Sequence, residues 1–112
     1  MNIGELGSRF GFEAVQGSFE DRPIAGGYTS DLLSDVMARA GDDFALITIQ
    51  AHKNTIAVAT LVGISAIIIC NNRPVPEDMT AAAKSENVAI FRTSKSQFEV
   101  SGMLYTMLQP AG

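Results

Sequence analysis

Cysteine, histidine and basic residues are scarce in this sequence of 112 residues, and tryptophan is absent. The single cysteine, Cys70, excludes a disulfide within the chain and cannot by itself hold an iron–sulfur cluster. The eight Lys and Arg residues are scattered and the formal net charge is -4, so the basic stripe that neutralises nucleic-acid phosphates is missing. We therefore expect no nucleic-acid partner.

A long apolar segment is missing as well. The first ten residues lack the apolar core of a signal peptide. The longest apolar run, residues 56–70, is interrupted by Thr60, Gly63 and Ser65 and is shorter than the ~20 residues of a membrane helix. These absences predict a cytoplasmic protein that does not bind a membrane.

The composition that remains is globular, with 46% hydrophobic and 18% charged residues in a length that forms one domain. Residues 44–50, 66–70 and 88–93 are apolar and β-branched without alternation, which is typical of parallel strands covered on both faces. Helices are predicted at residues 55–62, from Pro76 onward, and at 96–108, where Ser96 and Glu99 form a capping box. This order of elements predicts an α/β domain of three layers, α/β/α, with a mainly parallel sheet.

The first 23 residues are predicted to lead into a core α/β unit at residues 24–108, within a single domain of residues 1–112. A short helix at residues 3–10, ended by Gly11, comes before a short strand at residues 12–17. A second short strand is expected near Ile24, held at its start by Pro23.

Residues 24–41, which read IAGGYTSDLLSDVMARAG, predict a polar loop and then an amphipathic helix. Thr29 or Ser30 can cap this helix, and Gly41 can take the left-handed position that ends it. Asp35 and Arg39 have the spacing of an ion pair. The expected apolar stripe consists of Leu32, Leu33, Val36, Met37 and Ala40. A later helix, residues 55–62, can be capped by Asn54 and closed by Gly63.

Polar residues gather where four of the predicted strands end. Ligands of open parallel sheets bind beyond the carboxyl ends of the strands, so these four loops form the candidate ligand site. Helix N-termini after Tyr28 and Thr93 would suit an anionic ligand. The candidate binding residues are Gly26, Gly27, Tyr28, Thr29, Ser30, Gln50, His52, Asn54, Asn71, Asn72, Arg92, Thr93 and Ser94, with positive charge from Lys53, Arg73, Arg92 and Lys95. The alternative interpretation is that these residues are ordinary helix caps and solvated loops.

Catalytic signatures are weak. The adjacent Gly26 and Gly27 do not fit G-x-G-x-x-G, and the sequence G-x-x-x-x-G-K-[ST] of NTP-hydrolysing P-loops is absent. No acid at a fixed spacing orients His52, although a general base remains an alternative for it. Asp31 and Asp35 are interpreted as a solvated helix face. We expect no catalytic residue, no metal and no cofactor, and we interpret Cys70 as a small buried hydrophobe, with a redox thiol or metal ligand as the alternative.

Residues 24–108, with their segments SDLLSDVM and ITIQAHKN, resemble the DRTGG-type domain found at the N-terminus of HPr kinase/phosphorylase, in some phosphotransacetylases and in CBS-domain pyrophosphatases. The similarity is greatest to small stand-alone bacterial members, which tend to be encoded beside anaerobic iron hydrogenase components. The resemblance implies the HPr kinase N-terminal-domain fold and a regulatory or dimerising role without kinase activity. Residues 50–54 and 70–74 replace the family's signature segments, so the resemblance implies no ligand.

Two predicted helices are apolar on more than one face. Residues 55–62 are apolar nearly all round, and the last helix carries Phe98, Val100, Met103, Leu104, Tyr105, Met107 and Leu108. Such helices must be covered on more than one face, either by a larger core or by a partner. We expect a non-catalytic regulatory or accessory module that forms a homo-oligomer, in the simplest case a dimer, or binds a protein partner. The alternatives are a small-molecule or nucleotide sensor at the four-loop edge and a redox or metal-handling accessory protein using Cys70.

Overall fold

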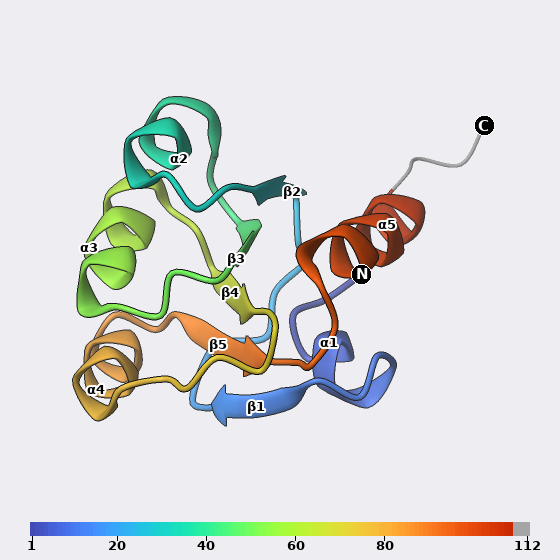
Figure 1. Cartoon of the computed structure of the whole chain (residues 1–112), viewed down its shortest axis with the longest axis horizontal. Coiled ribbons are helices and arrows are strands. Elements are labelled where there is room, and N and C mark those ends of the chain that lie inside the picture. The colour runs from blue at the N-terminus through green and yellow to red at the C-terminus, as the bar shows by residue number, and fades with distance from the viewer. Residues whose placement is uncertain (109–112) are drawn as a thin grey trace.

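A computed structural model of the chain describes residues 1–108 as a five-stranded sheet between two layers of helices (Figure 1). The sheet order is β1-β5-β4-β3-β2, with β2 to β5 parallel and β1 antiparallel to β5. The helices α2, α3 and α4 cover one face, and α1 and α5 cover the other (Figure 1). The elements are α1 (Glu5–Ser8), β1 (Glu13–Gln16), β2 (Gly26–Thr29), α2 (Leu33–Arg39), β3 (Phe44–Thr48), α3 (Lys53–Val62), β4 (Ala66–Ile69), α4 (Glu77–Ser85), β5 (Ala89–Arg92) and α5 (Gln97–Leu108). The predicted three-layer α/β/α architecture is confirmed.

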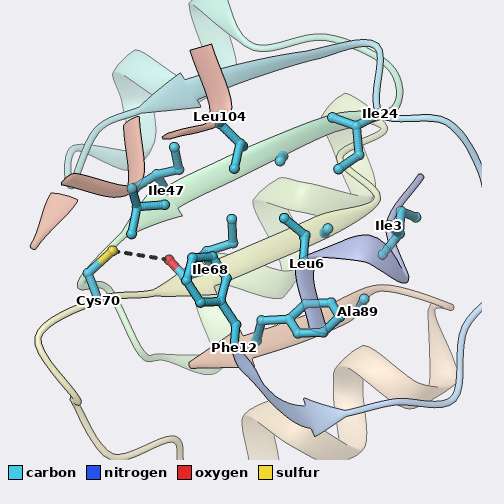
Figure 2. Packing of buried hydrophobic residues seen from close by; sticks show 13 residues of the cluster. Ile3, Leu6, Phe12, Ile24, Ile47, Ile68, Cys70, Ala89 and Leu104 are labelled. Carbon is cyan, nitrogen blue, oxygen red and sulfur yellow. Dashed lines mark hydrogen bonds between the residues drawn. The ribbon is translucent and has the colours of Figure 1, made fainter. Parts of the chain in front are cut away.

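The central strands are buried on both faces, which explains why their sequences do not alternate. In β4, Ala66 and Ile68 face α1 and α5, where they pack with Leu6 and Leu104 (Figure 2). The intervening Ile67 and Ile69 face the other helical layer. Successive side chains of a strand point to opposite faces, so a strand between two helical layers is apolar at every position.

Strands β2, β3, β4 and β5 follow one another across the sheet in one direction. The crevice of doubly wound sheets opens where this direction reverses, and these four strands have no such reversal. After β5 the chain crosses to the opposite face, where α5 packs on β2 and β3. The last helix therefore lies beside the edge of the sheet that β2 forms.

The second strand begins later than predicted. Ile24 is buried just before it, and the strand itself is Gly26–Thr29, paired in parallel with β3. The reason is that Tyr28 and Thr29 favour extended backbone, while Gly26 leaves room for the ring of Phe44. A Cβ at Gly26 would lie 2.8 Å from Cε1 of that ring. The two glycines therefore belong to a strand and not to a loop after it.

The predicted apolar stripe of α2 is only partly buried. Val36 is fully buried, whereas Leu32 is 64% exposed and Met37 is 49% exposed. The short α2 covers the sheet near its edge, where only one row of side chains reaches the core. Two apolar side chains on this helix therefore remain in contact with solvent.

Two further expectations for α2 are wrong. The ion pairs among residues 1–108 join Arg9 with Glu5, Arg22 with Asp43, and Arg92 with Glu13, so the expected Asp35–Arg39 pair is not formed. The carboxylate of Asp35 instead accepts a 2.6 Å hydrogen bond from the hydroxyl of Tyr28. The left-handed residue after the helix is Asp43, with φ of 60°, and not Gly41.

At the other helix ends, two expectations are confirmed and two are wrong. The capping box is confirmed, because the N–H of Ser96 donates to Glu99 Oε1 at 3.1 Å and the N–H of Glu99 donates to Ser96 Oγ at 3.2 Å. Gly63 ends α3 with φ of 90°. His52, and not Asn54, is the N-cap of α3, and Pro76 is the N-cap of α4 and not its first residue. Within residues 1–108, every helix is too short or too polar to cross a membrane.

Candidate functional site

Asp31 joins three elements at the carboxyl end of the sheet. Its Oδ1 accepts hydrogen bonds from the hydroxyl of Thr48 at 2.8 Å and from the N–H of Ile49 at 2.9 Å. Its Oδ2 accepts one from the side-chain amide of Gln97 at 3.1 Å. Thr48 ends β3 and Gln97 begins α5, so the carboxylate fastens the β2–α2 loop to both. Asp31 is therefore not the solvated helix-face acid that its position suggested.

The environment of Asp31 stabilises its charged form. Partial burial alone would raise the pKa of its carboxyl group. The hydrogen bonds from Ile49, Gln97 and Thr48, together with the positive charge of Arg73, outweigh that effect and hold the pKa below the ordinary value of 3.8. The carboxylate is ionised at neutral pH, and it gives the middle of the four-loop edge a negative charge.

The loops after β4 and β5 are fastened to each other. Asn71 and Asn72 have positive φ angles of 58° and 52°, which asparagine tolerates better than other residues with side chains. Their N–H groups donate to the carbonyl of Lys95 at 3.0 Å and to that of Thr93 at 2.8 Å. Both asparagines therefore shape the turn that joins these loops.

Several predicted binding residues are engaged in their own loops. Ser30 Oγ accepts the N–H of Leu32 at 3.1 Å, and Thr93 Oγ1 accepts the N–H of Lys95 at 3.2 Å. The backbone carbonyl of Gln50 accepts a hydrogen bond from the hydroxyl of Thr55, in the first turn of α3, at 2.8 Å. These contacts favour the interpretation of solvated loops and turns for this part of the candidate set. The expected cap of α2 at Thr29 or Ser30 is wrong, because the N-cap of that helix is Leu32.

Arg92 is also engaged, because its Nε and Nη2 atoms lie 3.0 and 2.9 Å from Glu13 Oε1 on the antiparallel strand β1. His52, Asn54 and Ser94 are exposed. No group of three or more His, Cys, Asp or Glu side chains suited to a metal occurs within residues 1–108.

Cys70 is the first residue after β4, yet its side chain lies inside the core and not on the exposed edge. Its side chain is buried within the cluster of Figure 2, where the thiol lies 4.0 Å from the carbonyl of Ile68. Burial and, secondarily, the charge of Asp31 raise its pKa to about 11. A protonated, inaccessible thiol is a poor nucleophile and a poor metal ligand.

Three candidates on β2, Gly26, Gly27 and Thr29, line a different feature, whereas Tyr28 faces the other helical layer. A hollow of about 330 Å³ lies between β2 and α5. Its residues are mostly small or apolar: Ala25, Gly26, Gly27, Thr29, Phe44, Ile47, Ser101, Leu104, Tyr105 and Leu108. The hydroxyl of Thr29 lies 2.7 Å from that of Ser101 and fixes the helix to the strand. The hollow is thus separate from the loops after β3, β4 and β5.

The structure therefore divides the predicted site in two. The loops at the carboxyl edge meet through Asp31, Asn71 and Asn72, whereas Gly26 and Gly27 lie on β2, the edge strand of the sheet. Sequence reasoning missed Thr48 and Gln97, whose role depends on contacts between distant segments. The available signal was an acid directly after a predicted strand, where Asp31 stands.

These features define a DRTGG-type α/β domain. The family described as HPr Serine kinase N terminus matches residues 46–108, more than half of the chain, and the chain belongs to that family. None of the curated proteins compared with it matches.

Part of a solved structure has the same fold. That structure contains the CBS and DRTGG domains of the regulatory region of Clostridium perfringens pyrophosphatase, complexed with the activator diadenosine tetraphosphate. The similarity has a TM-score of 0.71 at 12% sequence identity and covers 96% of this chain and 47% of that chain. The present chain thus spans about half the length of that regulatory region.

Proposed function

We propose that this chain is a non-catalytic regulatory or accessory module that acts by self-association. The observation that carries the proposal is an apolar surface beside the hollow between β2 and α5. Phe98 is 88% exposed and Tyr105 is 70% exposed, although both are large aromatic side chains on the same helix. Residues seven positions apart share a helix face, so these two rings mark one surface. Exposed apolar surfaces rimmed by polar residues are typical of interaction sites.

The carboxyl edge supports a non-catalytic role. Most of its polar groups are engaged in hydrogen bonds that hold loops together, and His52 is exposed without a side-chain hydrogen bond among the described residues. A general base needs a partner that orients it. The burial and raised pKa of Cys70 disfavour the alternative of a redox or metal-handling thiol.

Light scattering on the purified chain over a micromolar dilution series tests the proposal. We expect the mass of two chains at the higher concentrations and a shift toward one chain on dilution. The mass of one chain at every concentration would contradict self-association.

A nucleotide or phosphorylated metabolite is the second candidate ligand, bound at the carboxyl edge. Lys53, Arg73 and Lys95 stand outside the three ion pairs found among residues 1–108, and each lies in or next to a loop of this edge. The regulatory region that shares this fold over 47% of its length is complexed with diadenosine tetraphosphate, which gives this ligand class its support. The negative charge of Asp31 in the same edge opposes it.

A thermal-shift screen with diadenosine tetraphosphate, ATP and inorganic phosphate tests this second function. We expect a rise in melting temperature that is lost in Lys53→Gln and Arg73→Gln and kept in Lys84→Gln, on α4. No shift with any of these compounds would exclude this class of ligand.

The similarity of the segments SDLLSDVM and ITIQAHKN to stand-alone bacterial members adds a biological setting, anaerobic iron hydrogenase metabolism. Affinity capture with the tagged chain from anaerobically grown cells tests it. Recovery of hydrogenase components would support the setting. Capture of the untagged copy of the chain shows that complexes survive the procedure, and the absence of hydrogenase components from such a capture would contradict the setting.

A further inference from the structure

We infer that two copies of this chain join through the open edges of their β2 strands, which pair antiparallel and extend both sheets into one. The α5 helices of the two copies flank the junction on one face. This inference rests on the proposed self-association and specifies its surface.

The open edge follows from the sheet order. β2 is the last strand, and within residues 1–108 it pairs only with β3. Its edge is accessible, because Ala25, Gly27 and Thr29 are exposed. An uncovered edge strand presents unpaired N–H and C=O groups, which can pair with a further strand.

The hydrogen bonds of β3 identify the groups that face outward. The carbonyl of Phe44 accepts the N–H of Ser65, on the side of β4. Alternate residues of a central strand bond to opposite neighbours, so Ala45 and Ile47 bond to β2. In agreement, the carbonyl of Ile47 accepts the N–H of Ser30 at 3.2 Å.

The same alternation on β2 directs the backbone N–H and C=O groups of Gly26 and Tyr28 toward β3. It directs those of Gly27 and Thr29 toward the open edge. A two-fold axis perpendicular to the sheet keeps the same sheet face of both copies on one side. Residues opposite each other across the junction therefore have side chains on the same face, and such residues are an even number of positions apart in the chain. If the axis passes between the Tyr28 residues of the two copies, Gly27 lies opposite Thr29 of the second copy. The N–H and C=O groups of Gly27 and Thr29, four on each strand, then all form hydrogen bonds across the junction.

Two glycines, one on β2 and one on α5, have no explanation among residues 1–108. Among these residues, a Cβ at Gly27 would meet nothing closer than 3.8 Å, and a Cβ at Gly102, in the middle of α5, would meet no atom within 4 Å. Glycine weakens strands and helices, and within a strand it often marks a place where another backbone approaches. Gly102 lies on the exposed side of α5, between Phe98 and Tyr105.

The charge distribution favours a second copy as the occupant. Each chain carries a net charge of -4, so two copies repel each other unless they meet at uncharged surfaces. Residues 25–30 contain no Asp, Glu, Lys, Arg or His, and α5 contains only Glu99. An antiparallel pair of identical strands is also self-complementary, as a two-fold interface requires.

Charge insertion tests the surface. We expect Phe98→Glu and Tyr105→Glu to abolish the dimer at concentrations where the unaltered chain is dimeric. The matched control is Leu61→Glu on α3, in the opposite helical layer, where Leu61 is 72% exposed. This control should remain dimeric, and circular dichroism should show that all three variants are folded.

Oxidative cross-linking tests the register. Tyr28→Cys places two thiols in a non-hydrogen-bonded pair, with Cα atoms about 4.5 Å apart, a separation that a disulfide can span. We expect a disulfide-linked dimer under mild oxidation. The unaltered chain, whose Cys70 is buried, and Leu61→Cys should stay monomeric on a non-reducing gel.

Each outcome decides between the two proposals. A dimer that survives both glutamate substitutions and does not cross-link through Tyr28→Cys would overturn the β2 interface and leave self-association standing. A monomeric unaltered chain would overturn both, and an extended peptide of another protein would then be the occupant to seek at this edge.

Discussion

The hydroxyl of Thr48 and the carboxylate of Asp31, 17 residues apart, are joined by a 2.8 Å hydrogen bond where β3 leaves the sheet. Thr48 is completely buried. The same carboxylate holds the first turn of α5 through Gln97. Asp31 thus fixes α5, which carries the proposed interaction surface, to the end of the parallel sheet.

Asp31→Ala should lower the free energy of unfolding by about 1–3 kcal/mol, because it leaves a buried hydroxyl and a backbone N–H without their acceptor. Urea unfolding followed by circular dichroism measures the change. Glu20→Gln is the control, because Glu20 is exposed and should change stability by no more than about 0.5 kcal/mol. Equal stability of the two variants would contradict the structural role of Asp31.

The pKa of Asp31 also predicts a pH dependence. Because its pKa in the folded state lies below the ordinary 3.8, ionised Asp31 stabilises the fold above that pH, and this contribution is lost as the pH falls below it. Glu5 and Glu99 also have lowered pKa values, caused mainly by hydrogen bonds from Asn2 and Ser96, so the comparison must be with a variant. We expect Asp31→Asn to reduce the stability difference between neutral pH and pH values below 3.8. An unchanged pH profile would contradict this assignment.

The thiol of Cys70 should resist modification in the folded chain. Its pKa of about 11 keeps it protonated near neutral pH, and its burial excludes reagents. A coloured thiol reagent should react slowly in buffer and rapidly in concentrated urea. Equal rates in the two solvents would contradict the buried position and reopen the redox alternative.

Gly63→Ala should destabilise the chain more than Gly11→Ala. Both glycines have positive φ angles, which cost a residue with a side chain about 1–2 kcal/mol. At Gly63 the added methyl would also collide with the carboxylate of Asp42, whereas at Gly11 it meets open space. Thermal unfolding of the two variants measures the difference, and equal melting temperatures would be inconsistent with the close approach at Gly63.

The parallel core could be predicted because its sequence signals are local. The strands β3, β4 and β5 are uninterrupted apolar runs, and the capping box of α5 was recognised from two residues three positions apart. The start of β2 was missed because two glycines normally indicate a loop. Here the ring of Phe44 fills the space that a side chain at Gly26 would need, a contact between strands that the sequence does not display.

The candidate site was less predictable for the same reason. Parallel topology correctly places the polar loops at one edge, but it does not show which side chains are already engaged. Arg92 is paired with Glu13, 79 residues away, and Asp31 is held by β3 and α5. The sheet order also places β2 at an edge. Gly27, predicted as a ligand contact, is therefore part of an open strand.

Sedimentation equilibrium of the unaltered chain beside Tyr105→Glu and Leu61→Glu measures whether two chains associate through the face of α5 that carries Tyr105. We expect the mass of a dimer for the unaltered chain and for Leu61→Glu, and the mass of one chain for Tyr105→Glu. A single-chain mass for the unaltered protein at every micromolar concentration would contradict this expectation.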